Sequence, residues 1–206
     1  MLAVEKPISS KLLKTDSASN RRLHTVELHA GCVGAGLAAD CRALAQRARS
    51  ECSNYRETFD APMPGPQLVD RLSLFMQAYT LYGSVRPFCA AILVGAVDAD
   101  GPHLYMIEPS GVSWGYRACA VGKGRQTART ELEKLKLDEL GCEDAVIEAA
   151  KIIYLAHDES KDKEFELEIS WISPQSRNLH QLVPADVLEN AIRIAKQNLA
   201  TRMDYD

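Results

Sequence analysis

Apolar residues recur at two spacings along this chain, and the change of spacing separates helices from strands. From Leu37 to Tyr55 they follow the three-to-four spacing that marks one face of a helix. The Pro-rich link Pro62–Pro66 ends this helix. A second helix follows, and its predicted apolar face consists of Leu68, Leu72, Phe75, Met76 and Tyr79.

Shorter apolar runs, some alternating with polar residues, predict strands. A polar loop at Ser17–Asn20 separates the first two, and turns at Asp98–Gly101 and Pro109–Gly111 predict a meander of three strands in the middle of the chain. In the last strand every second residue from Phe165 to Trp171 is apolar, so one face is expected to be buried. The predicted strands are Leu2–Glu5, Leu23–Val33, Phe88–Val97, His103–Ile107, Val112–Val121 and Phe165–Ile172.

Three further helices complete the pattern, at Thr127–Leu137, Cys142–His157 and Pro184–Ala200. Strands and helices therefore come in groups and do not alternate, which argues against a doubly wound parallel sheet. The order predicts an α+β fold in which helix pairs cover two antiparallel sheets, formed by a single domain over residues 1–206.

Composition excludes several classes of function. The 206 residues are 46% hydrophobic and 25% charged, with a net charge of −4, so no excess of basic residues indicates a nucleic-acid partner. Apolar runs such as Cys89–Val97 are shorter than the ~20 residues of a membrane helix, and no secretory leader is visible. Six cysteines without CxxC pairs predict reduced thiols in a cytosolic or nuclear protein.

The chain offers few candidates for catalysis or for binding a cofactor. No GxSxG motif is present, and Pro109–Gly111 is predicted to be only a turn. The loop Gly122–Thr127 matches neither phosphate-binding pattern, so we expect it to pack the start of a helix onto a sheet. The nearest approach to a metal site has spacings that fit no zinc module, and consists of His29, Cys32, Cys41 and Cys52. We therefore predict no catalytic residue, no metal and no cofactor.

The segment Tyr79–Phe88, YTLYGSVRPF, resembles the helix-to-strand junction of α-type subunits of the proteasome core particle. Other segments resemble that family in the same order, among them NRRLHTVELHAGCVGAGLAADCRAL, LYMIEPSGVSWGY and AVGKGRQTARTELEKL. The segment KIIYLAHDESKDKEFELEISW is most similar to the seventh α position of the ring. The resemblance implies a four-layer αββα sandwich of the Ntn-hydrolase type.

The resemblance also implies a non-catalytic structural subunit of the α ring, acting in ubiquitin-dependent protein degradation in cytoplasm and nucleus. Active members of the family use an N-terminal Thr supported by an Asp and a Lys. Here the chain begins Met1-Leu2, Glu5 falls near the place of that Asp, and Arg22 falls near that of the Lys. An Arg stays protonated and is a poor proton shuttle. We therefore expect no peptide cleavage.

The partners implied by the resemblance are other α subunits, β subunits and the C-terminal tails of activators such as the regulatory-particle ATPases. The family receives these tails in pockets where a Lys pairs with the tail carboxylate and a Gly permits close approach. Those roles fall on Arg22 and Gly36. An Arg can still bind a carboxylate through two hydrogen bonds.

The family's opening segment, which comprises a gating tail, an outer helix and a first strand, has no match here. We expect weaker ring assembly and an ungated pore at this position. Two alternatives use the same fold. One is an independent Ntn-type amidohydrolase or peptidase, whose nucleophile would be freed by processing before Thr15, Thr25 or a Ser. The other is an adaptor that binds carboxylate-ended tails without a ring.

Overall fold

The computed structural model describes residues 1–8, 12, 21–157 and 165–203. Its strands are β1 (Leu2–Pro7), β2 (Leu23–Glu27), β3 (Ala30–Gly36), β4 (Ala90–Asp98), β5 (Gly101–Ile107), β6 (Ser113–Gly115), β7 (Phe165–Trp171) and β8 (Gln181–Leu182). Its helices are α1 (Ala38–Phe59), α2 (Gly65–Leu81), α3 (Arg125–Lys134), α4 (Cys142–Ala156) and α5 (Ala185–Met203), with the 3-10 turn η1 (Pro174–Ser176).

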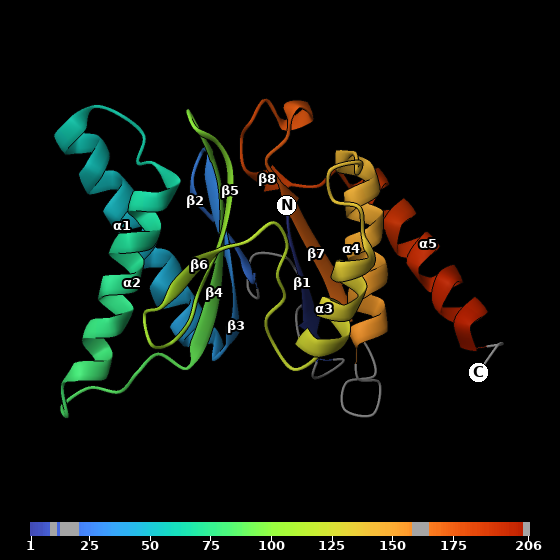
Figure 1. The fold of residues 1–206 in the computed structure, drawn as a ribbon, viewed down its shortest axis with the longest axis horizontal. Coiled ribbons are helices and arrows are strands. Elements are labelled where there is room, and N and C mark those ends of the chain that lie inside the picture. The colour runs from blue at the N-terminus through green and yellow to red at the C-terminus, as the bar shows by residue number, and fades with distance from the viewer. Residues whose placement is uncertain (9–11, 13–20, 158–164, 204–206) are drawn as a thin grey trace.

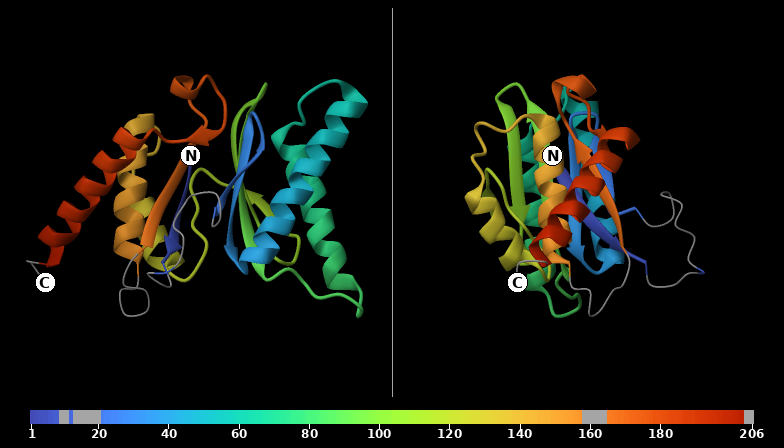
Figure 2. Two further views of the ribbon diagram at one scale, coloured as in Figure 1. Left: turned by 180° about the vertical axis from the view of Figure 1, so that it is seen from behind. Right: turned by 90° about the vertical axis from the view of Figure 1, so that its right-hand side faces the viewer.

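The elements form four layers (Figure 1). Strands β2-β3-β4-β5-β6 make one antiparallel sheet, and β1-β7-β8 make a second, smaller one. Helices α1 and α2 cover the outer face of the five-stranded sheet, while α3, α4 and α5 lie on the other side of the molecule (Figure 2). This is the helix–sheet–sheet–helix sandwich that the order of elements predicts, so the predicted fold class is confirmed.

Each helix layer encloses its own apolar cluster. Leu44 of α1, Leu72 and Met76 of α2, and Ile92 and Val94 of β4 are almost completely buried between α1, α2 and the larger sheet. The second cluster lies where α4 and α5 cover β7. Its members include Val146, Ala191, Leu167, Ile169 and Trp171. Because alternate residues of β7 enter this cluster, the predicted buried face of the strand is confirmed.

The layer between the two sheets is apolar in part and polar in part. Leu2, Leu23, Val33 and Leu93 form its apolar cluster. Residues 2, 4 and 6 of β1 share the face that points toward the larger sheet, and the register pairs them with residues 170, 168 and 166 of β7. Lys6 is therefore drawn into the interior, where only 2% of it is exposed.

The predicted strand Leu23–Val33 is wrong as a single element. It is a hairpin whose two arms, β2 and β3, pair antiparallel around Leu28 and His29. The turn contains no Gly, Asn or Pro, and apolar residues continue on both sides of it, so nothing in the pattern marks the reversal.

The predicted strand Val112–Val121 is also too long, because only Ser113–Gly115 pairs with β5. The chain then leaves the sheet edge, and Cys119 and Val121 pack against the cluster between the sheets. The short elements η1 and β8 were not predicted. The polar loop expected at Ser17–Asn20 lies outside the described residues.

One ion pair fixes the junction at which α2 ends and β4 begins. The guanidinium of Arg86 donates to both carboxylate oxygens of Asp40, over 2.7 and 2.8 Å, and the backbone N–H of Cys89 donates to Asp40 Oδ2 over 2.8 Å. Asp40 belongs to the first turn of α1. The hydrogen bonds from Arg86 hold the pKa of Asp40 at about 2, below its usual range.

Gly36 brings the backbones together beside this pair. It has a φ of +141°, and a Cβ at this position would lie 2.1 Å from the carbonyl oxygen of Cys89. The next residue, Leu37, donates its backbone N–H to that same oxygen over 2.9 Å. No residue with a side chain fits this conformation and this spacing without strain. Gly36 therefore has a structural role that is independent of any ligand.

We expect the variant Asp40→Ala to be less stable at neutral pH by on the order of 2 kcal/mol, because Cys89 N–H loses its acceptor. The folded-state pKa lies below the unfolded value of 3.8, so this stabilisation is complete above pH 3.8 and is lost as the pH falls toward 2. Urea unfolding of both proteins at a series of pH values measures the difference.

The matched control is Asp70→Ala, because Asp70 is exposed on α2. It should cost little at any pH. An Asp40→Ala protein as stable as the wild type at pH 7, or a difference in stability that does not shrink below pH 4, would contradict this account.

Candidate functional site

Arg22 lies immediately before β2, beside the inner face of the smaller sheet. Its backbone N–H donates to Glu168 Oε2 over 3.2 Å, and Lys6 donates to Glu168 Oε1 over 3.3 Å. Lys6 also pairs with Glu166 at 2.5 Å. Burial alone would lower the pKa of Lys6, but the hydrogen bonds and negative charges of Glu166 and Glu168 raise it above its ordinary value.

The guanidinium of Arg22 has a hydrogen-bond donor that is not used by the described residues. Its Nε is buried and has no hydrogen-bond partner among the described residues. The positive charge of Arg22 nevertheless reaches Cys41 in the first turn of α1. Burial raises the pKa of the Cys41 thiol, and Arg22 opposes that rise. A buried N–H without an acceptor is costly, and a guanidinium binds an anionic group well.

The structure brings Arg22 and Gly36 to the same end of the larger sheet. The register pairs Leu23 with Val33, so Arg22 lies alongside Gly34, two residues before Gly36. Gly36 is followed directly by α1, whose first residue has no side-chain cap before it. A cation and the uncapped N-terminus of a helix thus lie close together, and both favour a carboxylate.

Glu5 and Arg22 do not form a catalytic pair. Glu5 is paired with Leu167, whose side chain enters the cluster under α4 and α5, so it faces outward from the sheet. Its carboxylate lies 3.2 Å from His157 Nδ1. Arg22 instead contacts Glu168, on the opposite face of the same sheet. The two groups that fall near the family's catalytic supports are therefore separated by a sheet.

A histidine joins the two sheets at their edge. His180 Nδ1 lies 2.8 Å from Thr25 Oγ1 of β2, and His180 Nε2 lies 2.9 Å from Ser170 Oγ of β7. The backbone N–H of His180 also donates to the carbonyl of Leu28 over 2.7 Å. A Cβ on Gly31 would lie 2.0 Å from His180 Nε2, so only glycine leaves room for the ring.

Thr25 is accordingly not arranged as a nucleophile. It lies inside β2, where its carbonyl also accepts from Arg49 Nε over 2.8 Å. A new N-terminus at Thr25 would detach Leu23, a member of the cluster between the sheets. The partner of Thr25, His180, contacts the hydroxyl of Ser170 through its other nitrogen, where a catalytic histidine would contact a carboxylate. Thr15, the other candidate, lies outside the described residues.

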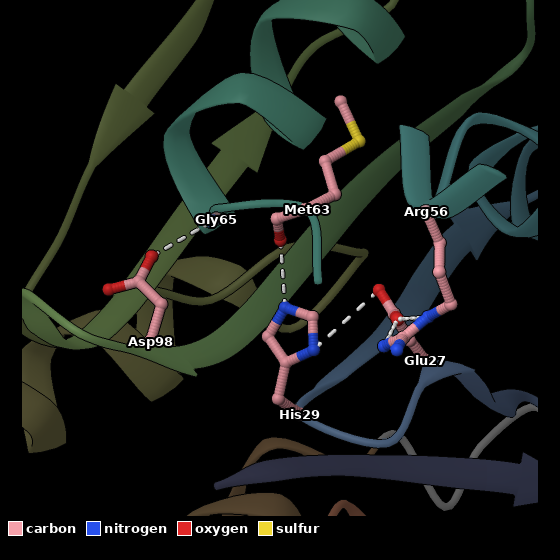
Figure 3. A network of polar contacts seen from close by, with 6 residues as sticks. All are labelled: Glu27, His29, Arg56, Met63, Gly65 and Asp98. Carbon is pink, nitrogen blue, oxygen red and sulfur yellow. Dashed lines mark hydrogen bonds and ion pairs between the residues drawn. The ribbon is translucent and has the colours of Figure 1, made fainter. Parts of the chain in front are cut away.

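Three turns meet at one corner of the larger sheet and are joined there by polar contacts (Figure 3). His29, in the β2–β3 turn, contacts the carbonyl of Met63 through Nε2 over 2.8 Å and lies 3.7 Å from Glu27 Oε2 through Nδ1. Arg56 near the end of α1 pairs with Glu27 Oε1. Asp98 accepts from the backbone N–H of Gly65 over 2.9 Å at the start of α2.

The other segments that the sequence offered as candidate sites have structural roles among the described residues. Pro109–Gly111 is a turn, closed by Gly111 N–H donating to the carbonyl of Glu108 over 2.9 Å. The loop at Gly122 does open a helix. Gly122 lies against Ala35 of β3, as expected for packing onto a sheet, whereas Gly124 packs against Ala156 of α4. No group of three or more metal-binding side chains is placed to hold an ion within these residues. No helix among them is both long and apolar enough to cross a membrane.

Two side-chain contacts between segments distant in sequence were not predicted. Asp40 and Arg86 are 46 residues apart, and His180 and Thr25 are 155 apart. Both members of the first pair stand in segments that carry the family resemblance, so the resemblance was the available signal for it. Nothing in the local sequence indicates the contacts of His180.

Comparisons of the sequence with known proteins support the family that the fold indicates. Residues 1–172 match the family model described as "Proteasome subunit". The chain is 52% identical to "Proteasome subunit alpha type-3" of Acanthamoeba castellanii, over 99% of this chain and 80% of the relative. It is 50% identical to the protein of the same name from Oryza sativa subsp. japonica, over 100% and 82%. It is 48% identical to "Probable proteasome subunit alpha type-7" of Saccharomyces cerevisiae (strain ATCC 204508 / S288c), over 97% and 70%.

His180 should make stability fall as the solution is acidified. Burial lowers its pKa to about 4, so the stability that depends on neutral His180 is fully present above the unfolded value of 6.5 and declines as the pH falls toward 4. We expect the stability difference between the wild type and His180→Gln to shrink by up to roughly 3 kcal/mol between pH 7 and pH 4. A difference that stays constant over this range, measured by urea unfolding, would refute the assignment.

Proposed function

This chain belongs to the proteasome subunit family as an α-type member, and from that membership we propose what it does in the particle. It is a non-catalytic structural subunit of the outer ring. It contributes one place in the ring and supports the gated passage of substrates and the docking of activators. The observation that carries the proposal is a family fold whose inter-sheet space holds ion pairs and a hydroxyl-bound histidine, and in which the described residues arrange no nucleophile.

A separate question is which position of the ring the chain occupies. The seventh position, expected from the segment before β7, is not confirmed, because most of the similar relatives are named alpha type-3. The two yeast relatives carry the number seven at 48% and 44% identity. We propose that the chain takes the place of the subunits named alpha type-3. Identification of its two ring neighbours by cross-linking tests this assignment.

We further propose that Arg22 and Gly36 belong to a pocket for the C-terminal carboxylate of an activator. The proposal is supported by the Nε of Arg22, which has no partner among the described residues, and by the nearby start of α1. Gly36 contributes through its backbone, since its conformation is already required by Cys89. A guanidinium offers two parallel donors to a carboxylate, whereas a lysine offers a point charge. We propose that the chain is located in the cytoplasm and the nucleus, where such particles would meet their activators.

A covalent probe tests the non-catalytic assignment. A threonine-directed inhibitor should label β-type partners in particles that contain this chain, and should leave the chain itself unlabelled. Intact-mass measurement of each separated subunit gives the readout. Stoichiometric modification of this chain at Thr25 or another residue would favour the independent amidohydrolase instead.

Tail binding tests the pocket. In particles containing the chain, Arg22→Ala should weaken binding of a carboxylate-ended tail peptide by at least about tenfold, since a hydrogen-bonded charge is lost. Arg22→Lys should retain part of the affinity. Fluorescence anisotropy with acid and amidated peptides gives the measurement, and only the acid form should respond.

The neighbouring exposed residue offers a matched control for that experiment. Arg21→Ala removes the same charge one position away and should change affinity less than twofold. Equal losses in the two variants would point to general electrostatic attraction. Unchanged affinity in Arg22→Ala would remove this residue from the pocket while leaving the ring assignment intact.

A further inference from the structure

Three arginines follow one another at seven-residue intervals along α1, at Arg42, Arg49 and Arg56. Seven residues make almost two turns of a helix, so the three side chains leave α1 on the same side. Two of them show which side this is. Arg49 Nε donates to the backbone carbonyl of Thr25 over 2.8 Å. Arg56 Nε donates to Glu27 Oε1 over 2.8 Å (Figure 3). The row therefore lies along β2, the edge strand of the larger sheet.

Arg42, the first of the row, is exposed and has no acceptor among the described residues. The row and β2 run in the same direction, because the acceptors of Arg49 and Arg56 also follow each other along the strand. Arg42 precedes Arg49 by about 10 Å of helix, which equals about three residues of strand. Counting that length back from Thr25 places Arg42 level with Arg22. The unused arginine of the row thus lies at the end of β2 that carries the proposed pocket.

Positive charge predominates at this end of β2. Burial lowers the pKa of His24, and nearby arginines, Arg49 and Arg42 among them, lower it further. The carboxylate of Glu168 opposes the arginines. Its two oxygens, however, already accept from Lys6 and from a backbone N–H. The guanidinium of Arg42 is therefore not engaged by any carboxylate of the described residues, and it is accessible to an anionic group of a partner.

We propose that Arg42 binds an acidic side chain of the activator tail whose terminal carboxylate Arg22 receives. The inference rests on the proposed pocket and adds the class of tail that the pocket prefers. A guanidinium binds a carboxylate through two parallel hydrogen bonds, and the local positive charge attracts an acidic segment before contact. An extended chain advances about 3.3 Å per residue, and Arg42 is level with Arg22. The acidic residue therefore belongs to about the last four residues of the tail.

Two pairs of tail peptides test this preference in particles that contain the chain. Each pair differs only by Glu or Gln, placed next to the C-terminal residue in one pair and about six residues before it in the other. Near the chain end, the Glu peptide should bind about three- to fivefold more tightly than the Gln peptide, as expected for a partly exposed ion pair. At the distant position Glu lies about 20 Å from the terminal carboxylate, so it should change affinity less than twofold. Fluorescence anisotropy gives the measurement.

Variants of the chain assign the preference to one side chain. Arg42→Ala should remove the preference for Glu near the chain end while leaving the affinity of the Gln peptide within about twofold, and Arg42→Lys should retain part of the preference. Arg21→Ala is the matched control, because Arg21 is exposed and its charge also lowers the pKa of His24. It should leave the preference within about twofold. Equal losses in Arg42→Ala and Arg21→Ala would indicate general electrostatic attraction and would overturn the proposal.

Failure of this inference differs from failure of the pocket. If the Glu and Gln peptides bind equally, and both lose affinity on amidation and in Arg22→Ala, the role of Arg42 is refuted and the pocket stands. If neither peptide binds, or if amidation has no effect, both proposals are refuted. Should Arg42→Ala fail to enter particles, the wild type alone still decides, because the absence of a Glu preference near the chain end would contradict the inference.

Discussion

The ion pair between Asp40 and Arg86 is the constraint on which the placement of the helix layer depends. It connects the first turn of α1 to the segment between α2 and β4, and the same carboxylate accepts from Cys89 N–H. Gly36 lets the backbone of β3 lie against Cys89 at that point. One residue thus determines where α1 begins and where β4 enters the sheet. Both helices then lie over β4, around the buried cluster that contains Leu72 and Ile92.

Side chains in the layer between the two sheets, where a hydrolase of this fold would carry its active site, are held by contacts of their own. Lys6 is buried against Glu166 and Glu168, and His180 is bound to hydroxyls from both sheets. His180 holds the two sheets together, whereas Lys6 joins β1 to β7 within the smaller sheet. At the edge of this space, Arg22 Nε has no partner among the described residues. The architecture therefore suits a structural subunit of the ring.

Periodicity was enough to predict the helices and most strands because their apolar faces are long. Helix α4 was predicted within one residue, and α1 was extended by four residues at its C-terminal end. The β2–β3 hairpin was missed because Leu28 and His29 carry no turn signal. The strand β6 was predicted too long because Cys119 and Val121 are apolar, but they pack against the cluster between the sheets and do not belong to a strand. The polar contacts of His180 and His29 depend on segments distant in sequence, and periodicity carries no information about them. Arg22 and Gly36 were indicated only by resemblance, and the structure adds a separate reason for Gly36.

The central claim is that this chain is a structural member of an outer ring, with its inter-sheet space closed to catalysis. The most direct measurement is an electron cryomicroscopy map of the native particle that contains it. We predict density for the chain in an outer ring, between two other α-type subunits, with His180 still bridging Thr25 and Ser170. A map that placed the chain in an inner ring, or as a free particle with a new N-terminal threonine in that space, would contradict the account.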